Sequence, residues 1–238
     1  MPGKTYDGAR RTYLSIVGGM IRQNVGEGFP NAVKRDYELK NGTKGVKWEL
    51  VFNEWTGHIV SLNTKETEFG IFLNIEFDDA ILSIGTESKY FSDFVRKLAS
   101  VKDLSVPITI KPFDFEDDKG KRFTGVSVFA NGEKMENYFY DATTKQNIHD
   151  YPTPTEEERK TWNKQDWKHY FGYTVVKFLT AYMTLAIAPK LQAIADAKEQ
   201  SDIDATAQAN VAHAKESGEM NISLDDPKEE IDINSVPF

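Results

Sequence analysis

The chain has 238 residues, of which 39% are hydrophobic and 12% aromatic, so it can bury a substantial core. It contains no cysteine, which excludes disulfides, thiolate metal sites and cysteine nucleophiles. The formal net charge of −8 is unevenly distributed. Residues 1–50 carry nine Lys or Arg against five acids, whereas residues 201–238 carry two Lys against nine acids. The chain therefore has a basic front and an acidic end.

From Thr12 to Tyr140, short β-rich runs alternate with Gly, Asn and Asp, a pattern typical of a barrel or sandwich rather than of βαβ units. Asn41-Gly42 predicts a hairpin turn, because both residues tolerate a positive φ. Asp78-Asp79 predicts a second turn. The expected strands are 12–23, 32–40, 46–56, 70–77, 80–85, 106–113 and 122–130.

One helix is expected to interrupt these strands. Ser88 is a suitable N-cap, and the apolar residues that follow it recur at helical spacing, namely Phe91, Phe94, Val95 and Leu98. Strands, then a helix, then more strands is the order of an OB-fold. We therefore expect a mainly β protein, in which residues 1–140 form an elaborated OB-fold-like barrel with one inserted helix.

The remaining residues predict three segments. Residues 141–163 are rich in proline and glutamate and predict a linker. Residues 164–199 predict a C-terminal helix, and residues 200–238 a disordered acidic tail. The apolar stripe of the helix comprises Phe171, Val175, Phe178, Tyr182 and Leu185. This stripe has two interpretations, packing against the barrel or self-association into a homo-oligomer. A membrane span is not favoured, because Lys177 lies in its middle.

Motifs of catalysis are weak in this sequence. Gly3-Lys4-Thr5 lacks the residues that precede these three in a phosphate-binding loop. The four histidines, His58, His149, His169 and His213, are scattered without ligand spacing. Glu76, Asp78 and Asp79 form the best carboxylate cluster, and a metal-dependent nuclease at this cluster is the alternative enzyme hypothesis. Because Asp-Asp at a hairpin apex is more typical of a turn, we expect no catalytic residues, no metal and no cofactor.

Basic residues interleaved with aromatic residues on the first three expected strands indicate a different function. Single-stranded nucleic acid is held by cations along its backbone and by aromatic rings on which bases stack. The expected DNA-binding residues are Arg22, Lys34, Arg35, Tyr37, Lys47, Trp48 and Trp55, and Tyr13 and Phe29 are further aromatic candidates.

The hairpin register decides which of these residues share a face. Hairpin loops of two or of four residues both place Arg35, Tyr37 and Trp48 on one face. That face also carries apolar residues, which favours a core position for Trp48. Trp55 does not lie on that face by the alternation of the strand, so it is the better candidate for base stacking.

The chain closes on an acidic segment, Glu229 to Asp232, followed by Asn234, Ser235 and then Val236-Pro237-Phe238. This end resembles the tails of single-stranded DNA-binding proteins of bacteria and their phages, in which acids precede Ile-Pro-Phe. Asn234 and Ser235 stand where that family has acids. The resemblance implies an OB-fold and a tip that recruits partner proteins. The tip residues are Asp232, Val236, Pro237 and Phe238.

Together these features predict a non-enzymatic protein that binds single-stranded DNA without sequence preference and acts in phage DNA replication or recombination. Its expected partners are single-stranded DNA and replication or recombination proteins recruited by the tail, with no membrane. The alternative is a phage structural or scaffolding protein with an oligomerising helix. No apolar leader follows Met1, so we expect a cytoplasmic location, in the host cell if the protein is encoded by a phage.

Overall fold

The computed structural model describes residues 11–38 and 42–216. The chain divides into two compact units, Met1–Ala195 and Asp196–Phe238, and the first unit is mainly β. Its strands are β1 (Thr12–Val17), β2 (Met20–Val25), β3 (Val33–Glu38), β4 (Lys44–Phe52), β5 (Trp55–Gly57), β6 (Ile59–Thr67), β7 (Gly70–Phe77), β8 (Ala80–Gly85), β9 (Ile108–Glu116), β10 (Arg122–Ala130), β11 (Glu133–Lys134), β12 (Tyr140–Asp141) and β13 (Gln146–Asn147). The helical segments are α1 (Lys89–Leu98), α2 (Glu156–Thr161), α3 (Lys164–His169), η1 (Tyr170–Val175), α4 (Val176–Tyr182), η2 (Met183–Ile187) and α5 (Ala188–Glu216), where η marks π-helix.

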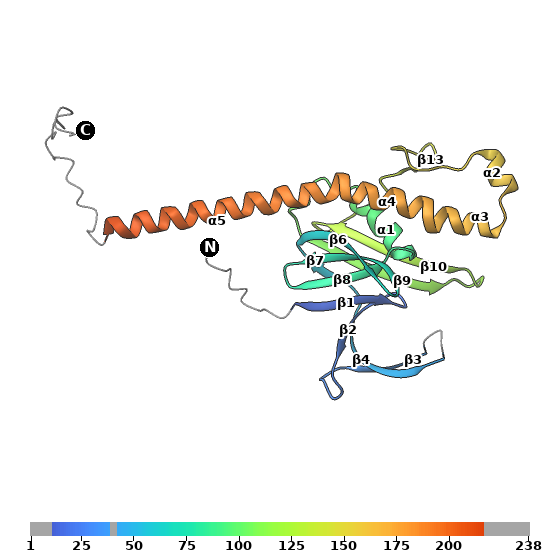
Figure 1. The fold of residues 1–238 in the computed structure, drawn as a ribbon, viewed down its shortest axis with the longest axis horizontal. Coiled ribbons are helices and arrows are strands. Elements are labelled where there is room, and N and C mark those ends of the chain that lie inside the picture. Colours follow the sequence, from blue (N-terminus) through green and yellow to red (C-terminus); the bar gives the residue numbers. More distant parts are fainter. Residues whose placement is uncertain (1–10, 39–41, 217–238) are drawn as a thin grey trace, which may run out of the picture. The chain divides into compact units, whose positions relative to one another are not determined.

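The largest sheet has seven strands in the order β3-β4-β2-β1-β8-β7-β6. All neighbours in it are antiparallel except β1 and β8, which run in parallel with Thr12 opposite Ala80 and Ser15 opposite Ser83. This parallel pair joins the N-terminal hairpins to the β6–β7–β8 meander (Figure 1). The predicted turn at Asp78-Asp79 is confirmed, because it connects the antiparallel strands β7 and β8.

The predicted single strand over residues 12–23 is wrong, because a tight turn divides it into β1 and β2. Gly18 and Gly19 form this turn with φ values of +60° and +74°, a region in which residues with a Cβ atom are strained. Gly19 also lies against the second sheet, where a Cβ atom would come within 2.4 Å of the backbone nitrogen of Asp114. Its own N–H donates a hydrogen bond of 3.0 Å to the hydroxyl of Tyr90. The turn thus fixes the first hairpin against β9.

The second sheet has four strands in the order β11-β10-β9-β5. The predicted strand over residues 46–56 ends in the first sheet at Phe52, and the chain then enters the second sheet, where Trp55 pairs with Ile110. The next strand, β6, was not predicted, because polar residues interrupt its alternation of apolar side chains.

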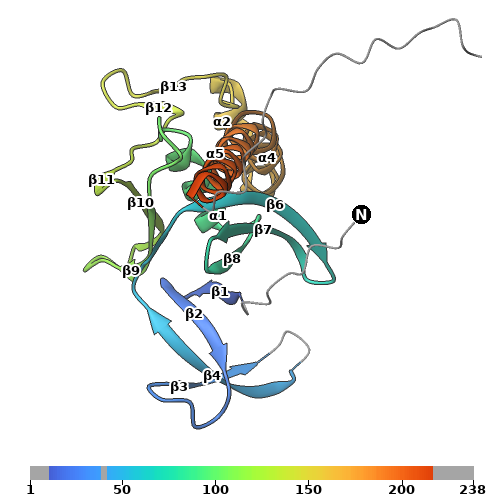
Figure 2. The same cartoon turned by 90° about the vertical axis from the view of Figure 1, so that its left-hand side faces the viewer.

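Helix α1 confirms the expected inserted helix. The Ser88 side chain accepts a hydrogen bond of 3.3 Å from the N–H of Phe91, as an N-cap does. The apolar residues at helical spacing are all buried, namely Phe91, Phe94, Val95 and Leu98. Because α1 contacts β8, β10 and α4, the core lies around it, between the sheets and below the C-terminal helix (Figure 2).

The helical run from α3 into α5 buries one side against this core. Its buried residues are Tyr170, Val175, Leu179, Met183, Ile187 and Leu191. These recur every four or five residues, which is wider than the 3.6-residue turn of an α-helix. The π-helical segments η1 and η2 supply the extra residues per turn, so the buried stripe stays on one side. Of the predicted apolar stripe, Val175 is buried and Phe178 and Tyr182 pack against the core, whereas Phe171 and Leu185 are exposed. Packing against the body is therefore observed for part of the stripe, and the prediction is wrong for Phe171 and Leu185.

The segments around this helix differ from expectation. The predicted linker 141–163 contains part of the β12–β13 hairpin and α2, whose N-cap Thr155 and residue Glu158 form a capping box. The expected helix end at residue 199 is wrong, because α5 continues to Glu216. The remainder of the predicted tail, residues 217–238, lies outside the described residues. By length and composition alone, the run Lys164–Asn210 could cross a membrane, a test that buried core helices also pass.

A mainly β body with an inserted helix and a C-terminal helix is therefore what the structure shows. Within the described residues the seven-stranded sheet is open, with β3 and β6 as its edges, and no closed barrel is formed.

We predict that Gly19→Ala lowers the free energy of unfolding more than Gly18→Ala does. Both changes put a Cβ atom at a positive φ, which costs about 1–2 kcal/mol, but only Gly19→Ala also meets the backbone of β9, whereas nothing lies within 4 Å of a Cβ atom at Gly18. Urea denaturation of the two variants measures the difference. An equal decrease in the free energy of unfolding for both variants would show that Gly19 does not pack closely against the backbone of β9.

Candidate nucleic-acid interface

The hairpin of β3 and β4 carries most of the predicted DNA-binding residues. Glu38 pairs with Lys44 across the loop, Arg35 lies opposite Lys47, and Lys34 opposite Trp48. The prediction that Trp48 shares a face with Arg35 and Tyr37 is wrong. An odd number of residues, five, separates Glu38 from Lys44 in the sequence. A shift of the register by one residue exchanges the two faces of a strand.

The two faces of this hairpin differ in chemistry. We call one the outer face, which comprises Arg22, Arg35, Tyr37, Lys47 and Glu49. Arg22 joins it from β2, because β2 pairs with β4 with Asn24 opposite Glu49. The other face carries Lys34 and Trp48, and in β2 and β4 it continues into Ile21 and Phe52, which belong to or pack against the core.

Glu49 lies at the centre of the outer face and is only 2% exposed. Its carboxylate accepts hydrogen bonds from Nε and Nη2 of Arg35 at 2.8 and 2.6 Å, and from Nη1 of Arg22 at 3.0 Å. The hydrogen bonds from Arg35 hold the pKa of the Glu49 carboxyl below its usual value, against desolvation, and the bond from Arg22 adds to this. The same bonds raise the pKa of Arg35. Three charged groups thus bind β2, β3 and β4 together and leave one net positive charge.

This role of Arg22 and Arg35 was not predicted. Both were assigned to DNA, yet each guanidinium already binds a buried carboxylate, and Arg22 also donates to the carbonyl of Val17 at 3.3 Å. Glu49 was overlooked although it is an acid placed between two strands that each carry an arginine. Only the register shows that the three side chains meet.

On the outer face, Tyr37 is half-exposed and Lys47 is exposed. The Lys47 ammonium lies 5.2 Å from the centre of the Tyr37 ring, within cation–π range. The ring lies over Gly45, where a Cβ atom would come within 2.5 Å of the ring atoms. Among the described residues Lys47 has no carboxylate partner. An aromatic ring and an unpaired cation therefore lie next to each other at the end of the sheet.

Trp55 does not belong to this surface. It lies in the second sheet, packs against the core, and contacts Phe52 edge-on with ring centres 5.3 Å apart. Its Nε1 is buried and has no hydrogen-bond partner within the described part of the chain. The prediction that Trp55 is exposed for base stacking is therefore wrong. Tyr13 and Phe29 are exposed at 69% and 50%.

The carboxylate cluster of the nuclease hypothesis is not assembled as a site. Glu76 accepts hydrogen bonds of 2.9 Å from Arg11 and from Asn63, which bind it to the sheet surface. Asp78 and Asp79 are exposed at the β7–β8 turn. In residues 11–38 and 42–216, no group of three or more His, Asp or Glu is placed to hold a metal ion.

The predicted partner-binding tip, Asp232, Val236, Pro237 and Phe238, lies outside the described residues. Comparison with known proteins gives no relative: no family model, no curated protein and no solved structure matches the chain.

We predict that Glu49→Gln destabilises the protein at neutral pH by about 1.5–3 kcal/mol, the usual contribution of hydrogen bonds to a charged group. Because the pKa of this carboxyl is lowered by folding, its stabilisation is complete above the unfolded pKa and is lost as the pH falls through the folded pKa. Urea denaturation of the wild type and the variant should therefore differ at neutral pH and converge in acid. A constant difference at every pH would contradict this role of the ionised carboxylate.

Proposed function

We propose that this protein binds single-stranded DNA without sequence preference and acts in phage DNA replication or recombination. The observation that carries the proposal is the pair of Tyr37 and Lys47 on the outer face, a half-exposed ring beside a cation that has no carboxylate partner among the described residues. We also propose that the β body is an elaborated form of the OB-fold.

The chemistry of the outer face suits a single strand better than a duplex. Unpaired bases expose their flat faces, and stacking on an aromatic ring contributes about 1–3 kcal/mol per base. Lys47 and the net positive charge of the Arg22–Arg35–Glu49 cluster attract the phosphates. Stacking and phosphate contacts do not depend on base identity, so the binding would tolerate any sequence.

The acidic end of the chain has a separate role in the proposal. Residues 201–238 carry two Lys and nine acids, a charge opposite to that of residues 1–50. The apolar tip, with Val236, Pro237 and Phe238, would recruit replication or recombination proteins by filling an apolar pocket, while upstream acids such as Asp232 steer it toward a basic rim.

A structural or scaffolding role is the second candidate. It is favoured by apolar side chains that the C-terminal helix leaves exposed, since Phe171 is 53% and Leu185 78% exposed. A stable oligomer that has no affinity for oligo(dT) would favour this candidate over the first.

We predict that Lys47→Ala weakens binding to oligo(dT) and reduces the slope of log K against log salt by about 0.7, the contribution of one phosphate contact to a single strand. Lys34→Ala is the matched control, because Lys34 lies on the same hairpin but on the other face. It should leave the slope unchanged. Fluorescence titration at several salt concentrations measures both.

The two variants together also show which face of the hairpin contacts DNA. If Lys34→Ala reduces the slope and Lys47→Ala does not, DNA contacts the face that carries Trp48, and the outer face is not the interface. If neither variant changes the slope, the hairpin does not contact DNA.

We predict that deletion of residues 236–238 leaves the affinity for oligo(dT) unchanged, because it removes no side-chain charge. The same deletion should abolish co-purification with replication or recombination proteins from a host lysate. DNA binding measured by gel shift and partner capture measured by mass spectrometry separate the two effects. Unchanged partner capture after the deletion would show that the tip is not the recruiting element.

A further inference from the structure

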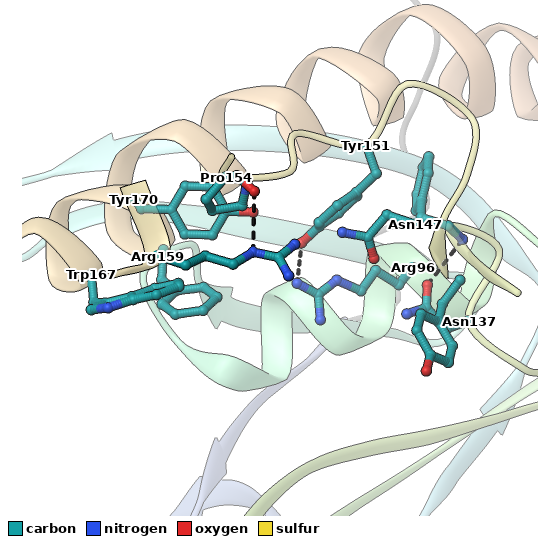
Figure 3. Close-up of a pocket in the computed structure, with 11 residues that line it drawn as sticks. Arg96, Asn137, Asn147, Tyr151, Pro154, Arg159, Trp167 and Tyr170 are labelled. Carbon is teal, nitrogen blue, oxygen red and sulfur yellow. Dashed lines mark hydrogen bonds between the residues drawn. The ribbon is translucent and has the colours of Figure 1, made fainter. Parts of the chain in front are cut away.

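A pocket of about 430 Å³ lies where the end of α1, the β12–β13 hairpin, α2 and the start of the C-terminal helix meet. Its volume is within the range of small-molecule sites. Figure 3 shows two arginines, Arg96 from α1 and Arg159 from α2, reaching into it among aromatic rings. The rings used in the argument are those of Tyr151, Trp167, Tyr170 and Phe171.

Both arginines lack a carboxylate partner among the described residues. Arg96 donates to the Tyr151 hydroxyl, and its guanidinium lies 5.1 Å from the centre of that ring. Its Nε is buried and has no hydrogen-bond partner in the part of the chain that the structure describes. Arg159 uses its Nε to donate to the carbonyl of Pro154 at 3.1 Å. The Nη groups of Arg159 have no partner among the described residues.

The two guanidinium groups act on the same neighbouring side chain, Tyr170. Burial raises the pKa of the Tyr170 hydroxyl to about 12, and both Arg96 and Arg159 act against that rise. Both guanidinium groups also line the same pocket. Two like charges that line one pocket repel each other, and an anion between them would remove the repulsion. A phosphate suits them best, because a guanidinium can donate two parallel hydrogen bonds to it.

The aromatic residues give the pocket an apolar wall. Trp167 and Phe171 stack with ring centres 5.7 Å apart and an angle of 23° between their planes. The Tyr170 hydroxyl donates to the carbonyl of Pro152 at 2.5 Å, which fixes that ring. Two carboxamides also line the pocket. Asn137 accepts a hydrogen bond from the N–H of Phe139 with its Oδ1, and Asn147 donates one to Thr153 with its Nδ2, so Nδ2 of Asn137 and Oδ1 of Asn147 can bind the edge of a base.

We infer that this pocket binds a nucleoside monophosphate unit, with the phosphate on Arg96 and Arg159 and the base against the aromatic wall. The unit can be a free nucleotide or one nucleotide of a strand. The site is separate from the outer face: in Figures 1 and 2, β3 and β4 lie at one end of the seven-stranded sheet, and α2 and the β12–β13 hairpin lie at the opposite end of the body. The inference therefore does not depend on the proposed function.

Isothermal titration of the full chain with dTMP tests the inference. Arg159→Ala should weaken binding at least about tenfold, equal to about 1.4 kcal/mol. Arg159 is exposed, so the variant should keep the fold, which circular dichroism checks. The matched control is Lys160→Ala, which removes the same charge from the same helix at a residue that does not line the pocket. It should bind dTMP like the wild type.

Thymidine and inorganic phosphate, titrated separately, should each bind at least about tenfold more weakly than dTMP, because each lacks one half of the recognised group. The inference is overturned if the wild type does not bind dTMP, if Arg159→Ala and Lys160→Ala bind it equally, or if either fragment binds as tightly as dTMP.

A competition experiment shows whether the pocket binds a free nucleotide or one nucleotide of a strand. Displacement of dTMP by oligo(dT) assigns the pocket to a strand, and retention of dTMP assigns it to the free nucleotide. The Lys47→Ala variant should bind dTMP normally, so a failure of the outer face as a DNA interface does not affect this test.

Discussion

β1 pairs with β8 in parallel, and through this pairing the two N-terminal hairpins join the β6–β7–β8 meander in one sheet. Closing so long a loop costs conformational entropy, which the burial of Leu14, Leu82 and Ile84 along the pair offsets. This contact also positions the three strands on the other side of β1 in the sheet, because β2 pairs with β1, β4 with β2, and β3 with β4. The position of the candidate interface therefore depends on a non-local strand pair.

At the β3 edge of this sheet, ion pairs rather than buried apolar side chains hold the strands together. Val33 and Val46 are exposed on the hairpin, whereas Glu49 is buried beneath two guanidinium groups. A buried carboxylate that lost one of these partners would be strongly destabilised, so the cluster fixes the register of β3 on β4. That register sets Tyr37 beside Lys47 and over Gly45. The same contacts that stabilise the hairpin thus shape the surface that we assign to DNA.

Local signals in the sequence predicted local structure well. Helix α1 has an N-cap and four apolar residues at helical spacing, and both features are seen. Features that depend on contacts between distant segments were not predicted. The odd number of residues in the β3–β4 loop reversed the face of Trp48. The crossing from β4 to β5 packed the half-buried Trp55 against the core, and Glu49 could be recognised only once β2, β3 and β4 were aligned. The pocket of Arg96 and Arg159 likewise combines residues from elements that no local pattern connects.

Photocrosslinking tests the central claim, the position of the DNA interface, most directly. Oligonucleotides that contain 5-bromodeoxyuridine would be irradiated with the full chain, and the adducts located by mass spectrometry of peptides. We predict adducts on the peptide that contains Tyr37, with a yield that falls as salt rises, because the strand is held beside Lys47. Adducts that are absent from this peptide and found only on those of Trp48 or Trp167 would contradict the account.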